Sequence, residues 1–460
     1  MATVYRIRRA YNSKNWDKAI ILANQRLEKN VDDVFSQGII IRAYYNKKEY
    51  TQCKYFWEIY RLTEFESLYQ KCLAIVDNIE FSDKKVLSKA ERLQKSQPRP
   101  KCETTWNPNC LEKMFSQEEN KVWLKTPESY VFWEMPDDFI LSEVHVDLLR
   151  LVTEILLYPF HKRIQFKLPG SRRLGSRPAL SFSAGTDSTA ASLVMPDNTI
   201  LGYHKRSFES MIDHRNAERL IEYMKKDGNE IISIMSNHEL IRTYHGKAVG
   251  FSCDFASATH LILLADYFDI GSIAFGTPID NTWLWKGRKF RNFEASDYWK
   301  KWSARFLSAG IELCFPIAGI SEAGCLKICQ QSKLLNYLNS CLRGDGVSGC
   351  GRCWKCFNKN GPLGRSCDVT SNEIKTFLQK RPMPTATNAL WVLKEMNLEH
   401  LVPDLANLTI LDLSWWTMAY PPAKEIIPSR WRNEIWTNIL SYLKEMPEPY
   451  LISEVNHFNE

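Results

Sequence analysis

A turn rich in small and hydroxylated residues follows a short apolar stretch near the middle of the chain. Residues 183–188 are Ser-Ala-Gly-Thr-Asp-Ser, after the apolar residues 179–182 and before a run typical of a helix. Gly185 lets the backbone pass close to an anion, and a helix that starts here would direct amide N–H groups and its positive dipole end at that anion. The hydroxyl groups beside these amides belong to Ser183, Thr186 and Ser188. The pattern predicts a site for the phosphates of a nucleotide.

The same turn has a plainer interpretation as an ordinary helix cap. Asp187 would then be the capping residue, and six residues alone do not separate a cap from a phosphate site.

A cluster of four cysteines forms the second chemical signal. Cys341, Cys350, Cys353 and Cys356 have the spacing Cys-x8-Cys-x2-Cys-x2-Cys. Four thiolates at about 2.3 Å around a tetrahedral Zn²⁺ need short, glycine-rich knuckles, and glycines stand at 349 and 351. Free cysteines or a disulfide pair are the alternative, which is weaker because nothing suggests secretion. We expect a structural zinc site, since four thiolates leave no open coordination position.

The turn resembles the PP-loop of the ATP pyrophosphatases, enzymes that split ATP between its α- and β-phosphates and adenylate a substrate oxygen. The usual form of that loop is Ser-Gly-Gly-x-Asp-Ser, and Ala184 replaces its first glycine. An alanine is tolerated there if its φ is negative. Together with the later cysteine cluster, the loop is similar to the branch that contains 7-cyano-7-deazaguanine synthase.

A more specific resemblance, over about residues 130 to 445, is to the MurL family of UDP-N-acetylmuramoyl-L-alanyl-L-glutamate epimerases. It rests on the loop and on short stretches at 195–197, 276–278, 319–322, 349–356 and 420–423. The resemblance implies an enzyme that uses ATP and Mg²⁺ to invert the terminal glutamate of a peptidoglycan precursor, with Asp187 as a ligand of Mg²⁺. The candidate ATP-binding residues are Ser183, Ala184, Gly185, Thr186, Asp187, Ser188, Gly276 and Thr277, and the candidate catalytic residues are Asp187, Ser188 and His204.

Composition agrees with a multidomain enzyme. The chain has 460 residues, 44% of them apolar, and a net charge of +7, which suffices for two or three packed domains. No long basic tract suggests nucleic-acid binding, and no stretch approaches the ~20 consecutive apolar residues that span a bilayer. Arginines at positions 6, 8 and 9 interrupt the place where a signal peptide would have its apolar centre. We therefore expect a cytoplasmic protein.

Residues 1–95 have the pattern of paired helices. Arg9-Ala10-Tyr11 recurs as Arg42-Ala43-Tyr44, and Trp16 recurs as Tyr50, offsets of 33 and 34 that match the tetratricopeptide (TPR) period. An unrelated helical bundle fits equally well. If the repeat is real, this region would contact a partner protein or dock on the catalytic domain. Residues 96–127 contain several prolines and are expected to be a linker or a surface loop.

Residues 128–367 alternate apolar segments with helical stretches, which predicts a parallel, doubly wound α/β sheet, here a PP-loop domain with the zinc site. The expected strands are 179–182, 199–203, 230–235, 272–275 and 312–315. Ligands bind such sheets beyond the carboxyl ends of the strands, where the loop, His204 and Gly276-Thr277 all fall. Residues 368–460 are expected to be helical, with the aromatic pair Trp415-Trp416 in the core.

The resemblance leads to a chemical expectation. A free carboxylate makes its α-hydrogen poorly acidic, whereas an acyl-adenylate accepts enolate charge, so a base can remove the proton and an acid can return one to the opposite face. The substrate would be a small-molecule carboxylate or a UDP-linked peptide, with ATP, Mg²⁺ and Zn²⁺ as cofactors. Two alternatives stay open: another adenylating enzyme that forms an amide or nitrile, and an inactive adaptor of the TPR type.

Overall fold

The computed structural model describes residues 3–76, 88–101, 104–161, 164, 166–210, 212–341 and 343–458. The chain divides into two units, Met1–Ser88 and Lys89–Glu460, which are described separately. No helix in these ranges is both long and apolar enough to cross a membrane.

The first unit is helical. Its α-helices are α1 (Val4–Asn12), α2 (Trp16–Leu27), α3 (Val34–Asn46), α4 (Tyr50–Tyr60) and α5 (Glu66–Val76). The side chains of Thr3, Asn15 and Asp33 cap the first three helices by accepting a hydrogen bond from a first-turn amide.

The repeat seen in the sequence falls on equivalent places in this unit. Arg9-Ala10-Tyr11 lies in the last turns of α1 and Arg42-Ala43-Tyr44 in those of α3, while Trp16 and Tyr50 are the first residues of α2 and α4. The two alanines are buried. The pairs α1–α2 and α3–α4 are thus two copies of one helical hairpin pattern, and their relation to tetratricopeptide repeats stays a prediction.

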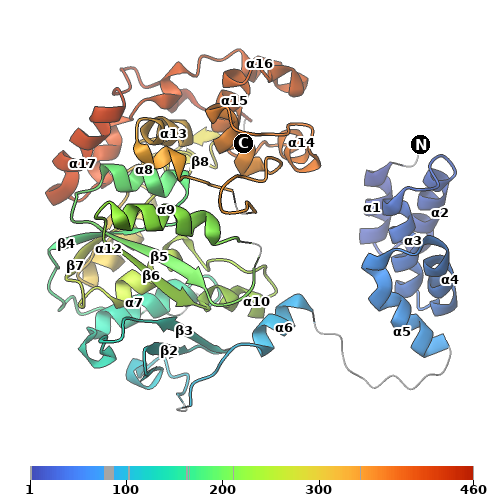
Figure 1. The fold of residues 1–460 in the computed structure, drawn as a ribbon, viewed down its shortest axis with the longest axis horizontal. Coiled ribbons are helices and arrows are strands. Elements are labelled where there is room, and N and C mark those ends of the chain that lie inside the picture. Colours follow the sequence, from blue (N-terminus) through green and yellow to red (C-terminus); the bar gives the residue numbers. More distant parts are fainter. Residues whose placement is uncertain are drawn as a thin grey trace. The chain divides into compact units, whose positions relative to one another are not determined.

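The second unit is built on an eight-stranded, mostly parallel sheet (Figure 1). The strand order is β1-β2-β3-β6-β5-β4-β7-β10, in which β6, β5, β4, β7 and β10 run parallel and β1–β3 form an antiparallel extension. The strands are β1 (Phe115–Glu118), β2 (Lys121–Lys125), β3 (Tyr130–Glu134), β4 (Arg177–Ser181), β5 (Ile200–Arg206), β6 (Ile231–Ser236), β7 (Ile270–Phe275) and β10 (Glu312–Cys314). The prediction of a mixed α/β fold with these five parallel strands is confirmed.

The expected domain limits differ from the structure at two places. The range 96–127, expected to be a linker, carries β1 and β2. Helix α6 (Lys89–Lys95), placed with the N-terminal helices from the sequence, belongs to the second unit, where the side chain of Gln94 donates a 2.8 Å hydrogen bond to Thr243 Oγ1.

Successive side chains of the parallel strands point to opposite faces of the sheet and pack in two separate apolar clusters, as the two-residue period of a strand requires. Ala179, Ile200 and Ile273 belong to one apolar cluster, whereas their neighbours Leu180, Leu201 and Ala274 belong to the other. The first cluster includes residues of α7 (Val146–Leu157), α11 (Thr259–Leu263) and α12 (Asp297–Ser308), and the second includes α8 (Thr186–Val194), α9 (Arg215–Lys226), α13 (Glu322–Gln330) and α17 (Ser429–Tyr442). Figure 1 shows α8 and α9 above the parallel strands β4, β5, β6 and β7, and α7 below them.

The second unit also contains two short strands and four further α-helices in its described residues. They are β8 (Leu284–Trp285), β9 (Lys289–Phe290), α10 (Ile241–Tyr244), α14 (Asn372–Gln379), α15 (Ala386–Glu395) and α16 (Ala406–Thr409). Trp415 and Trp416 are 5% and 1% exposed and pack in the first cluster, so these aromatic residues form core as expected.

Candidate functional site

The loop 183–188 leaves the carboxyl end of β4 and enters α8 at Thr186. The amide groups in the first turn of a helix have no intrahelical acceptor, so this turn presents donors and the positive end of the helix dipole. Ser188 braces the loop from inside: its hydroxyl accepts from the amide of Ser183 at 3.2 Å and donates to the carbonyl of Gly185 at 3.1 Å. The local geometry is that of an anion-binding turn.

Ala184 does not meet the condition of a negative φ. Its φ is +55°, in the left-handed region that glycine adopts without cost and that costs an L-residue roughly 1 kcal/mol. The side chain is also 2% exposed and packs with Phe182 and Ala190 in the second cluster. The loop therefore keeps the backbone path of a glycine while carrying a buried methyl group.

The loop opens on a cleft of about 940 Å³ at the carboxyl edge of the parallel sheet. Residues from β4, β5 and β7 and from the segments that follow them line this cleft. Those singled out from the sequence are Ser183, Ala184, Gly185, Asp187, Ser188, His204, Gly276 and Thr277. Thr186 is not in the wall, because its amide and hydroxyl both bond to Ser340 Oγ, at 2.8 and 2.6 Å.

Gly276 permits a close approach between two parts of the site. A Cβ atom built on it would lie 2.9 Å from Cα of Ser188 and 3.2 Å from the carbonyl oxygen of Asp187. Only glycine fits at such a distance from backbone atoms. The end of β7 is thereby held against the first turn of α8, and Thr277 is placed beside the loop.

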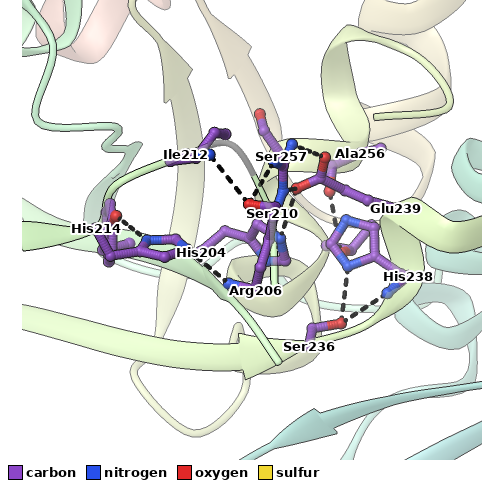
Figure 2. A network of polar contacts seen from close by, with 12 residues as sticks. His204, Arg206, Ser210, Ile212, His214, Ser236, His238, Glu239, Ala256 and Ser257 are labelled. Carbon is purple, nitrogen blue, oxygen red and sulfur yellow. Dashed lines mark hydrogen bonds and ion pairs between the residues drawn. The ribbon is translucent and has the colours of Figure 1, made fainter. Parts of the chain in front are cut away.

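A buried charge network forms another part of the wall (Figure 2). Nε2 of His204 lies 3.0 Å from Oε1 of Glu239, and the guanidinium of Arg206 donates to both oxygens of the same carboxylate. Burial raises the pKa of Glu239, but the hydrogen bonds from His204 and Arg206 outweigh it and lower the pKa to about 2. Glu239 is therefore ionised, and His204 is tied to it rather than free in the cleft. Nδ1 of His204 is buried and bonds to no described residue.

Two other polar pairs line the cleft and can carry protons. Tyr203 Oη and Nδ1 of His214 are 2.6 Å apart, and Tyr298 Oη donates to Asp254 at 3.0 Å. Burial, and then the charge of Lys205, lower the pKa of His214, so its imidazole is neutral near pH 7. A neutral imidazole is the form that accepts a proton.

Lys359 is a site residue that sequence reasoning missed. Its ammonium lies 2.6 Å from Asp187 and 2.9 Å from Glu322, and the residue is 6% exposed. Burial lowers the pKa of Lys359, but the two carboxylates outweigh it and raise the pKa. Asp280, fully buried, accepts from the amide of Glu322 at 3.1 Å, and its pKa is raised by burial and by the Glu322 charge. The loop carboxylate thus belongs to a buried cluster with one fixed cation.

The four cysteines lie together as predicted. Their sulfur atoms are 3.6 to 3.9 Å apart along Cys341–Cys353, Cys353–Cys356 and Cys350–Cys356. Thiolates at about 2.3 Å around a tetrahedral ion would be about 3.8 Å apart, whereas a disulfide requires about 2.05 Å. The cluster could hold a metal ion such as zinc.

The cysteine cluster is joined directly to the loop. Ser340, which holds Thr186, precedes Cys341 in the chain, and Lys359 lies in the single π-helical turn Cys356–Asn360. Folding of the cysteine knuckle therefore places both the hydroxyl that anchors the start of α8 and the cation that pairs with Asp187. A spacing pattern identifies the cysteines, but it does not reveal which neighbour of Cys356 turns toward the loop.

Comparison with known proteins gives one match. Residues 301–455 match a family described as a family of unknown function (DUF6395), a range that holds the cysteine cluster and the C-terminal helices but less than half of the chain. No curated protein and no solved structure matches.

Proposed function

We propose that the protein is an ATP-dependent, AMP-forming enzyme that adenylates a substrate carboxylate. The observation that carries the proposal is the convergence of the loop 183–188, Gly276 and Thr277 on one cleft at the carboxyl edge of a parallel sheet. The resemblance of the loop to the PP-loop signature also supports ATP binding at this cleft. ATP phosphates would be held by the first-turn amides of α8 and by the hydroxyl of Ser183, while Ser188 braces the loop through its bond to the carbonyl of Gly185.

The residues present fit a Mg²⁺ ion with the nucleotide. Asp187 stands in the first turn of α8, and its carboxylate is 29% exposed at the cleft. Carboxylate oxygens together with phosphate oxygens are the usual ligands of Mg²⁺, so Asp187 would hold the ion against the phosphates. Such an ion neutralises charge on the departing pyrophosphate.

We further propose, from the resemblance to the MurL family, that the reaction is epimerisation of a terminal glutamate in a UDP-linked peptide or a related carboxylate. Inversion requires one group that removes the α-proton of the acyl-adenylate and another that returns a proton to the opposite face. Hydrolysis of the acyl-adenylate by water then releases AMP and the inverted carboxylate. The pairs Tyr203–His214 and Tyr298–Asp254 are the candidates, because they reach the cleft from different elements of the fold. His204 contributes by holding Glu239 and the wall in place.

Incubation with ATP, Mg²⁺ and candidate carboxylates in D₂O tests the proposal. We expect AMP and pyrophosphate, with solvent deuterium at the α-carbon of a product of inverted configuration. A product of altered composition would instead support an amide- or nitrile-forming enzyme. If no carboxylate yields AMP, the proposal is wrong and the alternative of an inactive adaptor of the TPR type is favoured.

Variants of the pairs Tyr203–His214 and Tyr298–Asp254 separate adenylation of the carboxylate from inversion of its α-carbon. His214→Gln and Asp254→Asn should each keep AMP formation from a carboxylate while losing inversion. If both variants invert the substrate at the rate of the unmodified protein, the proton-transfer groups lie elsewhere.

A further inference from the structure

Three side chains with metal-binding atoms meet at a place remote in sequence from the cysteine cluster. The ligand atoms of Glu128, His161 and His245 all lie within 4.8 Å of one another. The three residues come from three segments: the turn between β2 and β3, the chain just after α7, and the residue after α10. Independent segments have no covalent reason to bring these three residue types together.

The spacing suits a tetrahedral ion. Nε2 of His161 is 2.9 Å from Oε1 of Glu128, and Nε2 of His245 is 3.5 Å from the same oxygen. Ligands that bind Zn²⁺ at 2.0–2.1 Å are about 3.3 Å apart at the corners of a tetrahedron. The two observed distances lie on either side of that value, so small side-chain rotations suffice to receive an ion.

Two side-chain atoms of these residues lack a hydrogen-bonding partner among the described residues. Oε2 of Glu128 and Nε2 of His245 are both buried, and neither makes a hydrogen bond there. Buried polar atoms in folded proteins are nearly always satisfied, and a bound ion is one of the recognised explanations when they are not. A cation between the three residues would satisfy Nε2 of His245.

The imidazole rings are held in orientation by their neighbours. Phe160 stacks on His245 with ring centroids 4.0 Å apart and planes 6° apart, and the two histidine rings meet edge to face at 5.5 Å. Packing of this kind limits rotation of the rings, which reduces the entropy lost when they bind an ion.

We propose that Glu128, His161 and His245 form a second metal site, separate from the cysteine cluster, for a divalent ion of the zinc class. Two imidazoles and a carboxylate favour Zn²⁺ over Mg²⁺ or Ca²⁺, which prefer oxygen ligands. Three protein ligands leave the fourth position of a tetrahedral ion to water or to a ligand. The ion would clamp the β2–β3 turn to the segments that follow α7 and α10, beside Phe160, which stacks on His245 and lines the cleft.

Metal stoichiometry of the full-length protein tests this site independently of any activity. After equilibrium dialysis against Zn²⁺, we expect two bound ions in the unmodified protein, one in His245→Gln and one in His161→Gln. His400→Gln, a change at an exposed histidine, should keep both. Substitution with Co²⁺ identifies the sites, because only the cysteine cluster gives thiolate charge-transfer bands, and these should persist in both ligand variants.

One outcome overturns the proposal. If the unmodified protein and both histidine variants bind the same amount of metal, the three residues are an ordinary hydrogen-bonded cluster. Circular dichroism of each variant shows whether a loss of metal reflects local change or unfolding. Unfolding of one variant leaves the other histidine variant as the test.

Discussion

At the scale of single residues, the contact between Lys359 and Asp187 governs the charge at the loop. Lys359→Met would leave the carboxylates of Asp187 and Glu322 facing each other without their cation. Breaking a buried ion pair in this way costs about 3–5 kcal/mol, so we expect a large fall in the urea midpoint and loss of AMP formation. Lys359→Arg should restore part of both.

An exposed pair provides the matched control for that change. Lys424 and Glu445 lie 3.0 Å apart with side chains 34% and 43% exposed. A surface pair contributes less than about 1 kcal/mol, so Lys424→Met should change stability little. Equal effects of the two lysine variants would contradict the role given to Lys359.

Substitutions at the adjacent positions 184 and 185 are expected to affect ATP binding differently. A Cβ on Gly185 would lie 3.4 Å from Ser183 Oγ and 3.9 Å from Ser340 Oγ, which is ordinary contact. Gly185→Ala should therefore fold normally yet weaken ATP binding about tenfold or more, because the methyl group would obstruct an anion at the loop. Ala184→Gly should keep ATP binding and change stability by no more than about 1 kcal/mol, since relief of the left-handed backbone strain at position 184 offsets the lost methyl contact.

Calorimetric titration with ATP and thermal melts of both variants check these values. Retained ATP affinity in Gly185→Ala would show that the phosphates lie elsewhere.

At the scale of elements, the cysteine knuckle is the support of the loop. Cys353→Ser, or removal of metal by a chelator, should free Ser340 and Lys359 from their positions and lower ATP affinity although neither treatment touches a loop residue. The measurement is ATP affinity as a function of bound zinc. Full ATP affinity in protein shown to be free of metal would contradict this coupling.

Sequence patterns predicted the elements that have strong local signals and missed those that depend on contacts. The parallel strands are short apolar runs with helices between them, so all five were found. Strands β1 and β2 lie beside proline-rich segments in the sequence, and their pairing becomes visible only through β3, which joins β6 across Trp133 and Ser236. Lys359 could not be found because its partners Asp187 and Glu322 are distant in sequence and meet it only when the knuckle folds.

At the scale of the whole molecule, the two units separate the proposed chemistry from the helical repeat. Every residue that lines the cleft belongs to the unit Lys89–Glu460. We expect residues 89–460, produced alone, to fold and to bind ATP with the affinity of the full chain. Loss of ATP binding in a folded fragment would show that the helices contribute to the site.

Burial of His260 makes the stability of the second unit depend on pH. Burial lowers the pKa of His260 to about 3. The folded state then binds fewer protons than the unfolded state between pH 6.5 and 3, so stability is full above pH 6.5 and is lost as the pH falls, by at most about 1.4 kcal/mol per pH unit for this residue. His260→Gln should flatten the dependence of the urea midpoint on pH, whereas His400→Gln at the surface should not. Parallel curves for His260→Gln and the unmodified protein would contradict the assignment.

The most direct test of the central claim is the fate of ATP labelled at the α-phosphate, incubated with metal-replete protein, Mg²⁺ and a panel of carboxylates that includes glutamate-ended UDP-linked peptides. We expect labelled AMP, formed only with an accepted carboxylate and abolished in Asp187→Asn and Ser188→Ala. Labelled ADP as the product, or AMP formation unchanged in both variants, would contradict it.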